Sequence, residues 1–181
     1  TLPQNEYTTP LNSRLPYAVV KNVGEAFCRS FKREYNLDYT IFRFFNTYGP
    51  KQSTDFVMSR FIKMALKNQD ITVYGDGQQT RTFCYVDDNI RATTNCLYQD
   101  KFVNDTVNIG SDLEVSIVDL ANLIIRVTGS KSKIAHLPPL PEGDMKRRIP
   151  DITKMMELMD DRELTPLEKG IKAVVDKAMF V

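Results

Sequence analysis

The chain has 181 residues, of which 26% are charged and 42% are hydrophobic, and its formal net charge is +1. A net charge so close to zero argues against nucleic acid or a membrane surface as the main partner. No apolar run approaches the roughly 18 residues that a membrane-spanning helix needs. The three cysteines lack C-x-x-C spacing and there is a single histidine, so we expect no metal site and a reducing, cytoplasmic compartment.

The first predicted element is a helix over residues 15–35, which follows a loop containing Pro and Asn. Tyr17 and Lys21 form a Y-x-x-x-K pattern in this helix, and the i, i+4 spacing places the phenol and the ammonium on one face. The ammonium favours the phenolate, so Tyr17 is a candidate proton acceptor near neutral pH. The same spacing is also typical of an exposed surface pair.

A buried strand is predicted for residues 38–45, which are rich in β-branched and aromatic side chains and lead into a turn at residues 46–50. Because residues 40–45 are apolar on both faces, they predict a covered parallel sheet and an α/β fold. Such a strand needs neighbours on both sides, and too few are encoded upstream. The next predicted elements are a helix at 54–67, strands at 71–74 and 82–86, and a helix at 87–97.

The C-terminal part continues the alternation of strands and helices. A strand at 106–109 precedes Ser116-Ile-Val-Asp119, a capping-box pattern that opens a helix to residue 127. A short strand is predicted at 133–136. Thr165-Pro-Leu-Glu168 forms a second capping-box pattern and predicts the start of the last helix.

Six spaced motifs together resemble one enzyme family. They are Tyr17-Ala-Val-Val-Lys21, Asn46-Thr-Tyr-Gly-Pro50, Val73-Tyr-Gly-Asp-Gly77, Gln79-Thr-Arg-Thr-Phe83, Tyr85-Val-Asp87 and Arg147-Arg148-Ile-Pro-Asp151. This ordered set resembles the extended short-chain dehydrogenase/reductase family, specifically its NAD-dependent nucleotide-sugar epimerases, 4,6-dehydratases and decarboxylases. The resemblance runs from Pro16 to the end of the chain.

The resemblance implies a particular fold and domain organisation. Residues 1–50 are expected to be the C-terminal segment of an NAD-binding Rossmann domain. Residues 51–181 are expected to form mainly a smaller α/β lobe that binds a nucleotide sugar, returning in part to the Rossmann sheet. In this family a helix carrying Y-x-x-x-K commonly joins a dimer interface, which predicts a homodimer. Val23, Phe27 and Phe31 suit such an interface and equally suit ordinary core packing.

Two features of the family are missing from the chain. The Gly-rich turn that holds the dinucleotide pyrophosphate is absent, since the only G-x-G is Gly75-Asp-Gly77, without a third glycine in register. The family's upstream Ser/Thr, which bonds the substrate hydroxyl, is also absent, and Thr1 begins about where that stretch ends. We therefore expect the C-terminal part of a larger enzyme, inactive on its own as given.

The resemblance also implies roles for single residues. Tyr17 is the expected base, Lys21 bonds the nicotinamide ribose, and Thr47 lies beside the nicotinamide, with NAD as the cofactor. Guanidinium groups suit the diphosphate of the substrate. Candidate ligands of the nucleotide sugar, expected to be a UDP-sugar, are Asn46, Arg60, Phe61, Tyr74, Arg81, Arg147 and Arg148.

Each of these substrate-site candidates has a simpler structural interpretation. Arg81 is also compatible with a surface strand arginine, Asn46 with a turn residue, Tyr74 with core packing, and Arg60 with a solvated helix face. His136 is interpreted as a structural histidine.

The reaction catalysed stays open among three chemistries that share a transient 4-keto sugar. Gln79-Thr-Arg-Thr-Phe83 resembles UDP-glucuronate decarboxylases, whereas Tyr17-Ala-Val-Val-Lys21 is closer to epimerases and dehydratases. Epimerase is placed ahead of decarboxylase and 4,6-dehydratase by a narrow margin. An alternative of another class is a non-catalytic nucleotide-binding lobe.

Overall fold

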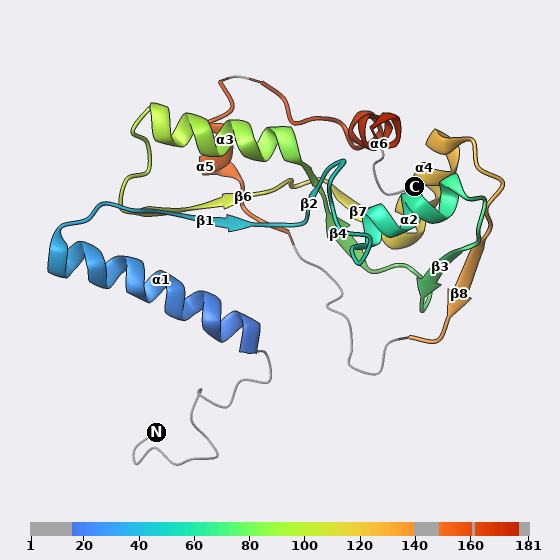
Figure 1. The fold of residues 1–181 in the computed structure, drawn as a ribbon, viewed down its shortest axis with the longest axis horizontal. Helices are drawn as coiled ribbons and strands as arrows, with labels where there is room; N and C mark the ends of the chain where they lie inside the picture. The colour runs from blue at the N-terminus through green and yellow to red at the C-terminus, as the bar shows by residue number, and fades with distance from the viewer. Residues whose placement is uncertain (1–15, 140–148, 161, 178–181) are drawn as a thin grey trace, which may run out of the picture. The chain divides into compact units, whose positions relative to one another are not determined.

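The computed structural model describes residues 16–139, 149–160 and 162–177. It divides into two compact units, one formed by Thr1–Ile41 with Phe102–Thr106 and the other by Phe42–Lys101 with Val107–Val181. Helices and strands alternate along the chain, which confirms the predicted α/β class (Figure 1). The functional division expected at residue 50 stays a prediction. No helix in the described ranges is long and apolar enough to cross a membrane.

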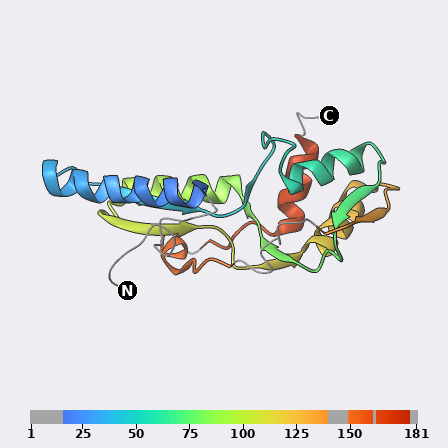
Figure 2. The same cartoon turned by 90° about the horizontal axis from the view of Figure 1, so that it is seen from below.

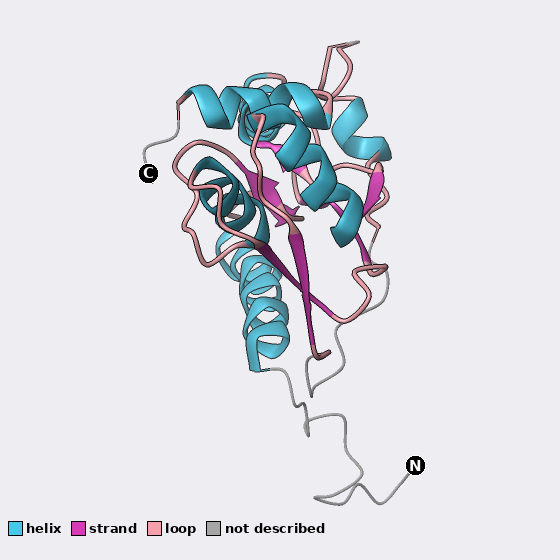
Figure 3. Ribbon diagram, turned by 90° about the vertical axis from the view of Figure 1, so that its right-hand side faces the viewer, coloured by secondary structure: helices cyan, strands magenta, loops and turns pink. Residues whose placement is uncertain are grey.

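The predicted elements are present, with small shifts at their ends. The structure adds three short elements that the pattern did not predict, β2, β7 and α5, and it has two strands, β4 and β5, where the pattern predicted one strand at 82–86. Figure 3 distinguishes the strands from the helices by colour. In chain order the elements are α1 (Pro16–Tyr35), β1 (Thr40–Phe44), β2 (Thr47–Tyr48), α2 (Val57–Leu66), β3 (Ile71–Tyr74), β4 (Thr80–Thr82), β5 (Cys84–Tyr85), α3 (Val86–Tyr98), β6 (Asp105–Ile109), β7 (Glu114–Ser116), α4 (Ile117–Thr128), β8 (Ile134–Leu137), α5 (Thr153–Met156) and α6 (Leu167–Asp176).

The first unit is dominated by α1. Its C-terminal end is held by Lys32, whose ammonium lies 2.6 Å from the Asp38 carboxylate, and Asn104 Nδ2 donates to the same oxygen at 2.6 Å. The Lys32 hydrogen bond, followed by that from Asn104, lowers the pKa of Asp38. Along the helix, several large apolar side chains are exposed, namely Tyr17, Val19, Val20, Val23, Phe27, Phe31 and Tyr35.

The strands form four pairs. β2 and β5 are parallel, with Thr47 opposite Cys84, and β3 and β8 are parallel, with Ile71 opposite Ile134. β4 and β7 are antiparallel, with Arg81 opposite Val115, while β1 pairs with β6. Parallel pairing of strands separated in sequence agrees with the α/β class. The predicted burial of β1 is wrong, since its residues are half-buried or exposed in the described structure.

The core of the second unit lies among α2, α4, α6 and the strands beside them. α4 contacts both α2 and α6 (Figure 2), because each helix carries an apolar stripe at helical spacing. Burying these stripes supplies the main driving force for folding of this unit. The buried core comprises Tyr48, Met58, Phe61, Ile62, Ala65, Ile71, Val73, Tyr85, Ile117, Leu120, Ala121, Ile124, Ile171 and Val174.

One predicted capping box is confirmed and the other is wrong. Ser116 Oγ accepts a hydrogen bond from Asp119 N at 3.0 Å, as the pattern predicts. Thr165 does not cap α6, since its backbone N–H and its hydroxyl both donate to the Asp88 carboxylate, at 2.8 and 3.0 Å. The N-cap is Pro166, without a side-chain cap. Thr165 therefore ties the start of α6 to the first turn of α3.

The β2–β5 pair is buried except at the half-buried Thr47, and its ionisable groups are neutral at neutral pH. Burial raises the pKa of the Cys84 thiol to about 12, and the nearby Asp88 carboxylate adds to the shift. Burial also raises the pKa of the Tyr48 hydroxyl, with further contributions from Cys84 and Asp88. Both groups therefore favour their protonated forms in the folded chain.

Replacing Gly170 by alanine is expected to destabilise the second unit. A methyl group on Gly170 overlaps the Tyr48 hydroxyl and comes within 2.8 Å of Tyr48 Cζ, and Tyr48 is 1% exposed. Overpacking costs about 1–3 kcal/mol, and here it exceeds the gain of about 1 kcal/mol from helix propensity. Denaturant unfolding should show a lower free energy of unfolding. Gly24→Ala in α1, where nothing lies within 4 Å, is the matched control and should not destabilise.

Cys84 is expected to resist alkylation at pH 8 while Cys28 reacts. With a pKa of about 12, the Cys84 thiolate fraction at pH 8 is on the order of 10⁻⁴, and the side chain is 2% exposed. The raised pKa contributes stability that is full below pH 9 and is lost as the pH rises towards 12. Iodoacetamide labelling with peptide mass mapping tests this expectation, and the urea-unfolded chain is the control. Equal labelling rates at both cysteines in the folded chain would contradict it.

Candidate functional site

Tyr17 and Lys21 lie one turn apart in the first unit. Lys21 Nζ is 5.2 Å from the centroid of the Tyr17 ring, and Tyr17 is 74% exposed. The helix therefore brings the phenol and the ammonium together on one face. Neither the phenol nor the ammonium is buried in the described structure, so both are accessible to a ligand.

The remaining described candidates lie in the second unit, where Asn46 follows β1. Asn46 Nδ2 donates to the Thr82 carbonyl at 2.9 Å, and Cys84 N donates to the Asn46 carbonyl at 3.0 Å. These two bonds anchor the turn between β1 and β2 on β4 and β5. Asn46 itself is exposed, which leaves its second amide N–H and its Oδ1 accessible to a ligand.

Thr47 is half-buried, and both its hydroxyl and its carbonyl are hydrogen-bonded. Its hydroxyl donates to the Phe45 carbonyl at 3.2 Å and accepts from Asn89 Nδ2 at 2.5 Å. Its carbonyl accepts from Gln52 Nε2 at 2.5 Å, and Gln52 Oε1 accepts from Ser59 Oγ at 2.7 Å. Sequence reasoning missed Asn89, Gln52 and Ser59, since polar residues in helices and loops are usually solvated.

Arg60 and Phe61 are neighbours on α2 with different surroundings. Phe61 is 0% exposed and belongs to the core of the second unit. Arg60 is half-buried, and its Nε is buried without a hydrogen-bond partner among the described residues. Its guanidinium carbon is 5.8 Å from the centroid of the Phe61 ring. Phe61 therefore serves packing directly, whereas Arg60 retains hydrogen-bonding capacity for an anion.

Tyr74 and Arg81 flank the turn between β3 and β4. Tyr74 ends β3 at 36% exposure, and Arg81 Nη1 donates to the Thr80 carbonyl at 2.6 Å. Gly77 has φ +73°, and a methyl group there meets Val73 Cγ1 at 2.8 Å. The turn therefore requires a glycine at this position. Arg147 and Arg148 lie outside the described residues.

His136 contacts the backbone, and the structural role expected for it stays a prediction. His136 lies on β8, and its Nδ1 is 2.8 Å from the carbonyl oxygen of Gly75. Among the described residues, no group of three or more His, Cys, Asp or Glu side chains is arranged to hold a metal ion.

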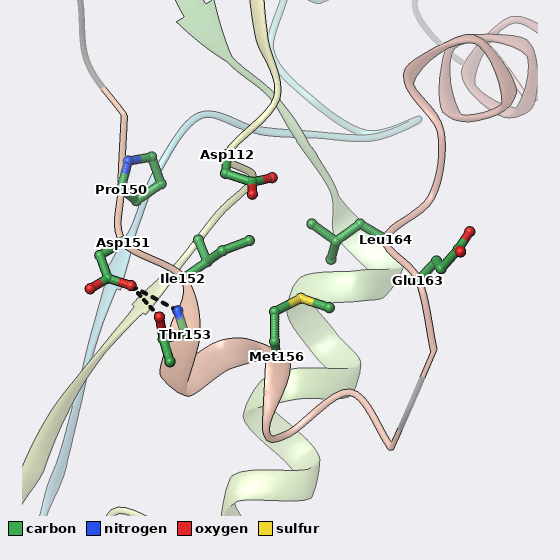
Figure 4. Close-up of a pocket in the computed structure, with 8 residues that line it drawn as sticks. All are labelled: Asp112, Pro150, Asp151, Ile152, Thr153, Met156, Glu163 and Leu164. Carbon is green, nitrogen blue, oxygen red and sulfur yellow. Dashed lines mark hydrogen bonds between the residues drawn. The ribbon is translucent and has the colours of Figure 1, made fainter.

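A cavity of about 470 Å³ lies beside α5 (Figure 4). Asp112, Asp151 and Glu163 line it, and Asp151 Oδ1 accepts from both Thr153 N and Thr153 Oγ1. These hydrogen bonds lower the pKa of Asp151, so the carboxylate is ionised at neutral pH. Three carboxylates disfavour a diphosphate. None of the predicted site residues that the structure describes lines this cavity.

Known proteins match this chain over most of its length. The model of the NAD dependent epimerase/dehydratase family matches residues 1–110. A UDP-N-acetyl-alpha-D-glucosaminuronate decarboxylase of Bacillus cytotoxicus is 38% identical over 90% of this chain and 52% of its own length. UDP-glucuronic acid decarboxylase 1 of Xenopus tropicalis is 34% identical over 96% of this chain and 42% of its own length.

Solved structures show the same likeness in three dimensions. UDP-glucose 4-epimerase of Thermotoga maritima, crystallised with UDP-glucose, superposes with a TM-score of 0.82 at 32% identity, over 90% of this chain and 52% of that one. UDP-glucuronic acid 4-epimerase of Bacillus cereus, in complex with UDP-glucuronic acid and NAD, superposes with a TM-score of 0.80 at 33% identity. The match covers 90% of this chain and 52% of that one. The fold is therefore that of part of a Rossmann-type epimerase.

The chain spans about half the length of the curated relatives that it matches. The family model nevertheless covers 110 of the 181 residues, from position 1 to position 110. The motif order, the parallel strand pairs and the structural superposition agree with this match. The chain belongs to the NAD-dependent epimerase/dehydratase family.

Proposed function

We propose that this chain is the C-terminal part of an NAD-dependent enzyme that modifies a UDP-sugar through a transient 4-keto sugar. The observation that carries the proposal is the superposition, over 90% of the chain, on an epimerase crystallised with UDP-glucuronic acid and NAD. The proposed division assigns residues 1–50 to the NAD-binding domain and residues 51–181 mainly to the substrate lobe. We place the enzyme in the cytoplasm, as a homodimer at full length.

Tyr17 and Lys21 fit the nicotinamide end of NAD. The phenol is exposed, and the Lys21 ammonium lies 5.2 Å from the centroid of its ring, so both groups can meet one ligand. Tyr17 takes the proton from a sugar hydroxyl, and Lys21 bonds the nicotinamide ribose. NAD, when bound, supplies the acceptor and donor of hydride.

The second unit supplies the proposed groups for the nucleotide sugar. Arg60 and Arg81 offer guanidinium groups for the diphosphate, and Phe61 supports Arg60 from the core. Asn46 offers an exposed amide, and Thr47 is proposed to lie beside the nicotinamide. Proposed contacts of the nucleotide sugar that complete the set are Tyr74, Arg147 and Arg148.

Epimerisation is the proposed reaction, with decarboxylation or 4,6-dehydration as the alternative. All three share proton removal by Tyr17 and differ only in the fate of the 4-keto sugar. Curated relatives named as decarboxylases keep the alternative open. A non-catalytic nucleotide-binding lobe is the candidate of another class, since about half of the relatives' length is absent from this chain.

Calorimetric titration of the chain with UDP and with NAD tests the assignment of the substrate lobe. We expect binding of UDP and UDP-sugars, because the proposed diphosphate ligands lie in the second unit, and no tight binding of NAD. Arg81→Ala should weaken UDP binding about tenfold, the effect of removing a charge-assisted contact. Lys133→Ala, an exposed position next to β8, is the matched control. Absence of UDP binding by the unaltered chain would contradict the proposal.

Removing the Tyr17 hydroxyl tests the catalytic role in the full-length enzyme. Tyr17→Phe should lower turnover about 10²- to 10⁴-fold, the usual contribution of a general base, while UDP affinity stays unchanged. Tyr35→Phe is the matched control, because Tyr35 is 72% exposed at the other end of α1. Turnover and UDP affinity are measured for both variants. Normal turnover by Tyr17→Phe would exclude Tyr17 as the base.

A further inference from the structure

Asn89 is a buried polar residue in the first part of α3 that the proposed mechanism does not use. It is 3% exposed, and its Nδ2 donates to Thr47 Oγ1 at 2.5 Å. The two residues are 42 positions apart in the chain. The bond therefore joins α3 to β2 at the turn that carries Asn46.

The direction of this hydrogen bond is fixed by the partner of Thr47. A hydroxyl has one proton, and that of Thr47 is directed to the Phe45 carbonyl, 3.2 Å away. Thr47 Oγ1 therefore accepts from the amide nitrogen of Asn89. The bond from α3 therefore fixes the rotamer of Thr47. Through the Thr47 hydroxyl it also restrains the backbone from Phe45 to Thr47.

Three other hydrogen bonds leave the turn little freedom. Asn46 Nδ2 donates to the Thr82 carbonyl at 2.9 Å, and Cys84 N donates to the Asn46 carbonyl at 3.0 Å. Gln52 Nε2 donates to the Thr47 carbonyl at 2.5 Å. Together with the bond from Asn89, these bonds constrain the side chains of Asn46 and Thr47 and the backbone of this turn. The free N–H and the Oδ1 of Asn46 are thus presented in one orientation.

Keeping an asparagine at this position costs stability. Asn89 Oδ1 is buried and has no hydrogen-bond partner among the described residues. An unpaired buried amide oxygen destabilises a fold, because it loses its hydrogen bonds to water without replacement. An apolar side chain of similar size removes that penalty.

Anchoring of α3 does not require Asn89. The first turn of α3 is already held by Asp88, which accepts from Thr165 N at 2.8 Å and from Thr165 Oγ1 at 3.0 Å. Ala92 and Cys96 supply its buried apolar contacts. The bond from Asn89 to Thr47 thus adds constraint at the turn beyond what holds the helix in place.

We propose that Asn89 is a positioning residue for the nucleotide-sugar site, which holds Thr47 and thereby orients Asn46 towards the substrate. This inference rests on the proposed function, in which Asn46 contacts a nucleotide sugar. Buried polar groups that cost stability are found where they preorganise a binding site. Asn89 acts through Thr47 and does not itself touch the ligand.

The test is UDP binding by Asn89→Leu, measured by calorimetry on the full chain together with the midpoint of thermal unfolding. Leucine removes the donor and the unpaired oxygen while keeping the branched shape and the number of side-chain heavy atoms. We expect UDP affinity to fall about tenfold, the scale of a misplaced contact group, with the midpoint unchanged or raised. Thr47→Val should weaken binding similarly, and adding Asn89→Leu to it should cause no further loss.

Asn95→Leu on the same helix is the matched control. Asn95 Nδ2 donates to the Leu158 carbonyl at 2.8 Å and to Asp160 Oδ2 at 2.7 Å, so its role is structural. This variant should lower the unfolding midpoint and leave UDP affinity unchanged. If Asn89 had only a structural role, Asn89→Leu would likewise lower the unfolding midpoint and leave UDP affinity unchanged.

The outcomes separate this inference from the proposed function. UDP binding by the unaltered chain, with equal affinity in Asn89→Leu, would overturn the positioning role alone. A lowered midpoint in Asn89→Leu would overturn the claim that the amide is kept at a cost to stability. Failure of the unaltered chain to bind UDP would overturn the proposed function and the positioning role with it.

Discussion

The second unit depends on the carboxylate of Asp88. Its two hydrogen bonds from Thr165 join the first turn of α3 to the segment that starts α6, across 77 positions of sequence. With α6 held there, Gly170 closes on the Tyr48 ring and the core between α6, α4 and α2 is completed. Burial, with a smaller contribution from this carboxylate, keeps the Cys84 thiol and the Tyr48 hydroxyl protonated. Asp88 thus contributes both to the packing and to the electrostatics around β2 and β5.

Local patterns predicted the elements well where the deciding interactions are local. The helical period predicted α2, α4 and α6, and Ser116 caps α4 through a residue three positions away. Thr165 carries the same pattern, yet its hydroxyl bonds Asp88, a partner that no local rule reveals. A capping pattern describes what a side chain can do, and tertiary structure decides which partner it takes.

In the candidate site, too, some features follow from local sequence patterns and others depend on tertiary structure. The one-turn separation of Tyr17 and Lys21 follows from helix geometry alone, and motif order identified Asn46 and Thr47. The burial of Phe61 did not follow from its motif, because helical spacing defines a stripe without saying how deeply it is covered. Asn89 escaped notice for a related reason, since asparagine in a helix is usually solvated.

The apolar side chains of α1 are covered less than those in the core of the second unit. Phe27 and Phe31 are exposed, whereas Phe61 and Ile124 are sealed in the second unit. A helix with few buried contacts opens locally without global unfolding, and its amide hydrogens exchange first. Tyr17 and Lys21 therefore lie in the segment that opens most readily. Fixing them in a reactive arrangement carries a conformational entropy cost that ligand binding must offset, which couples local folding to recognition.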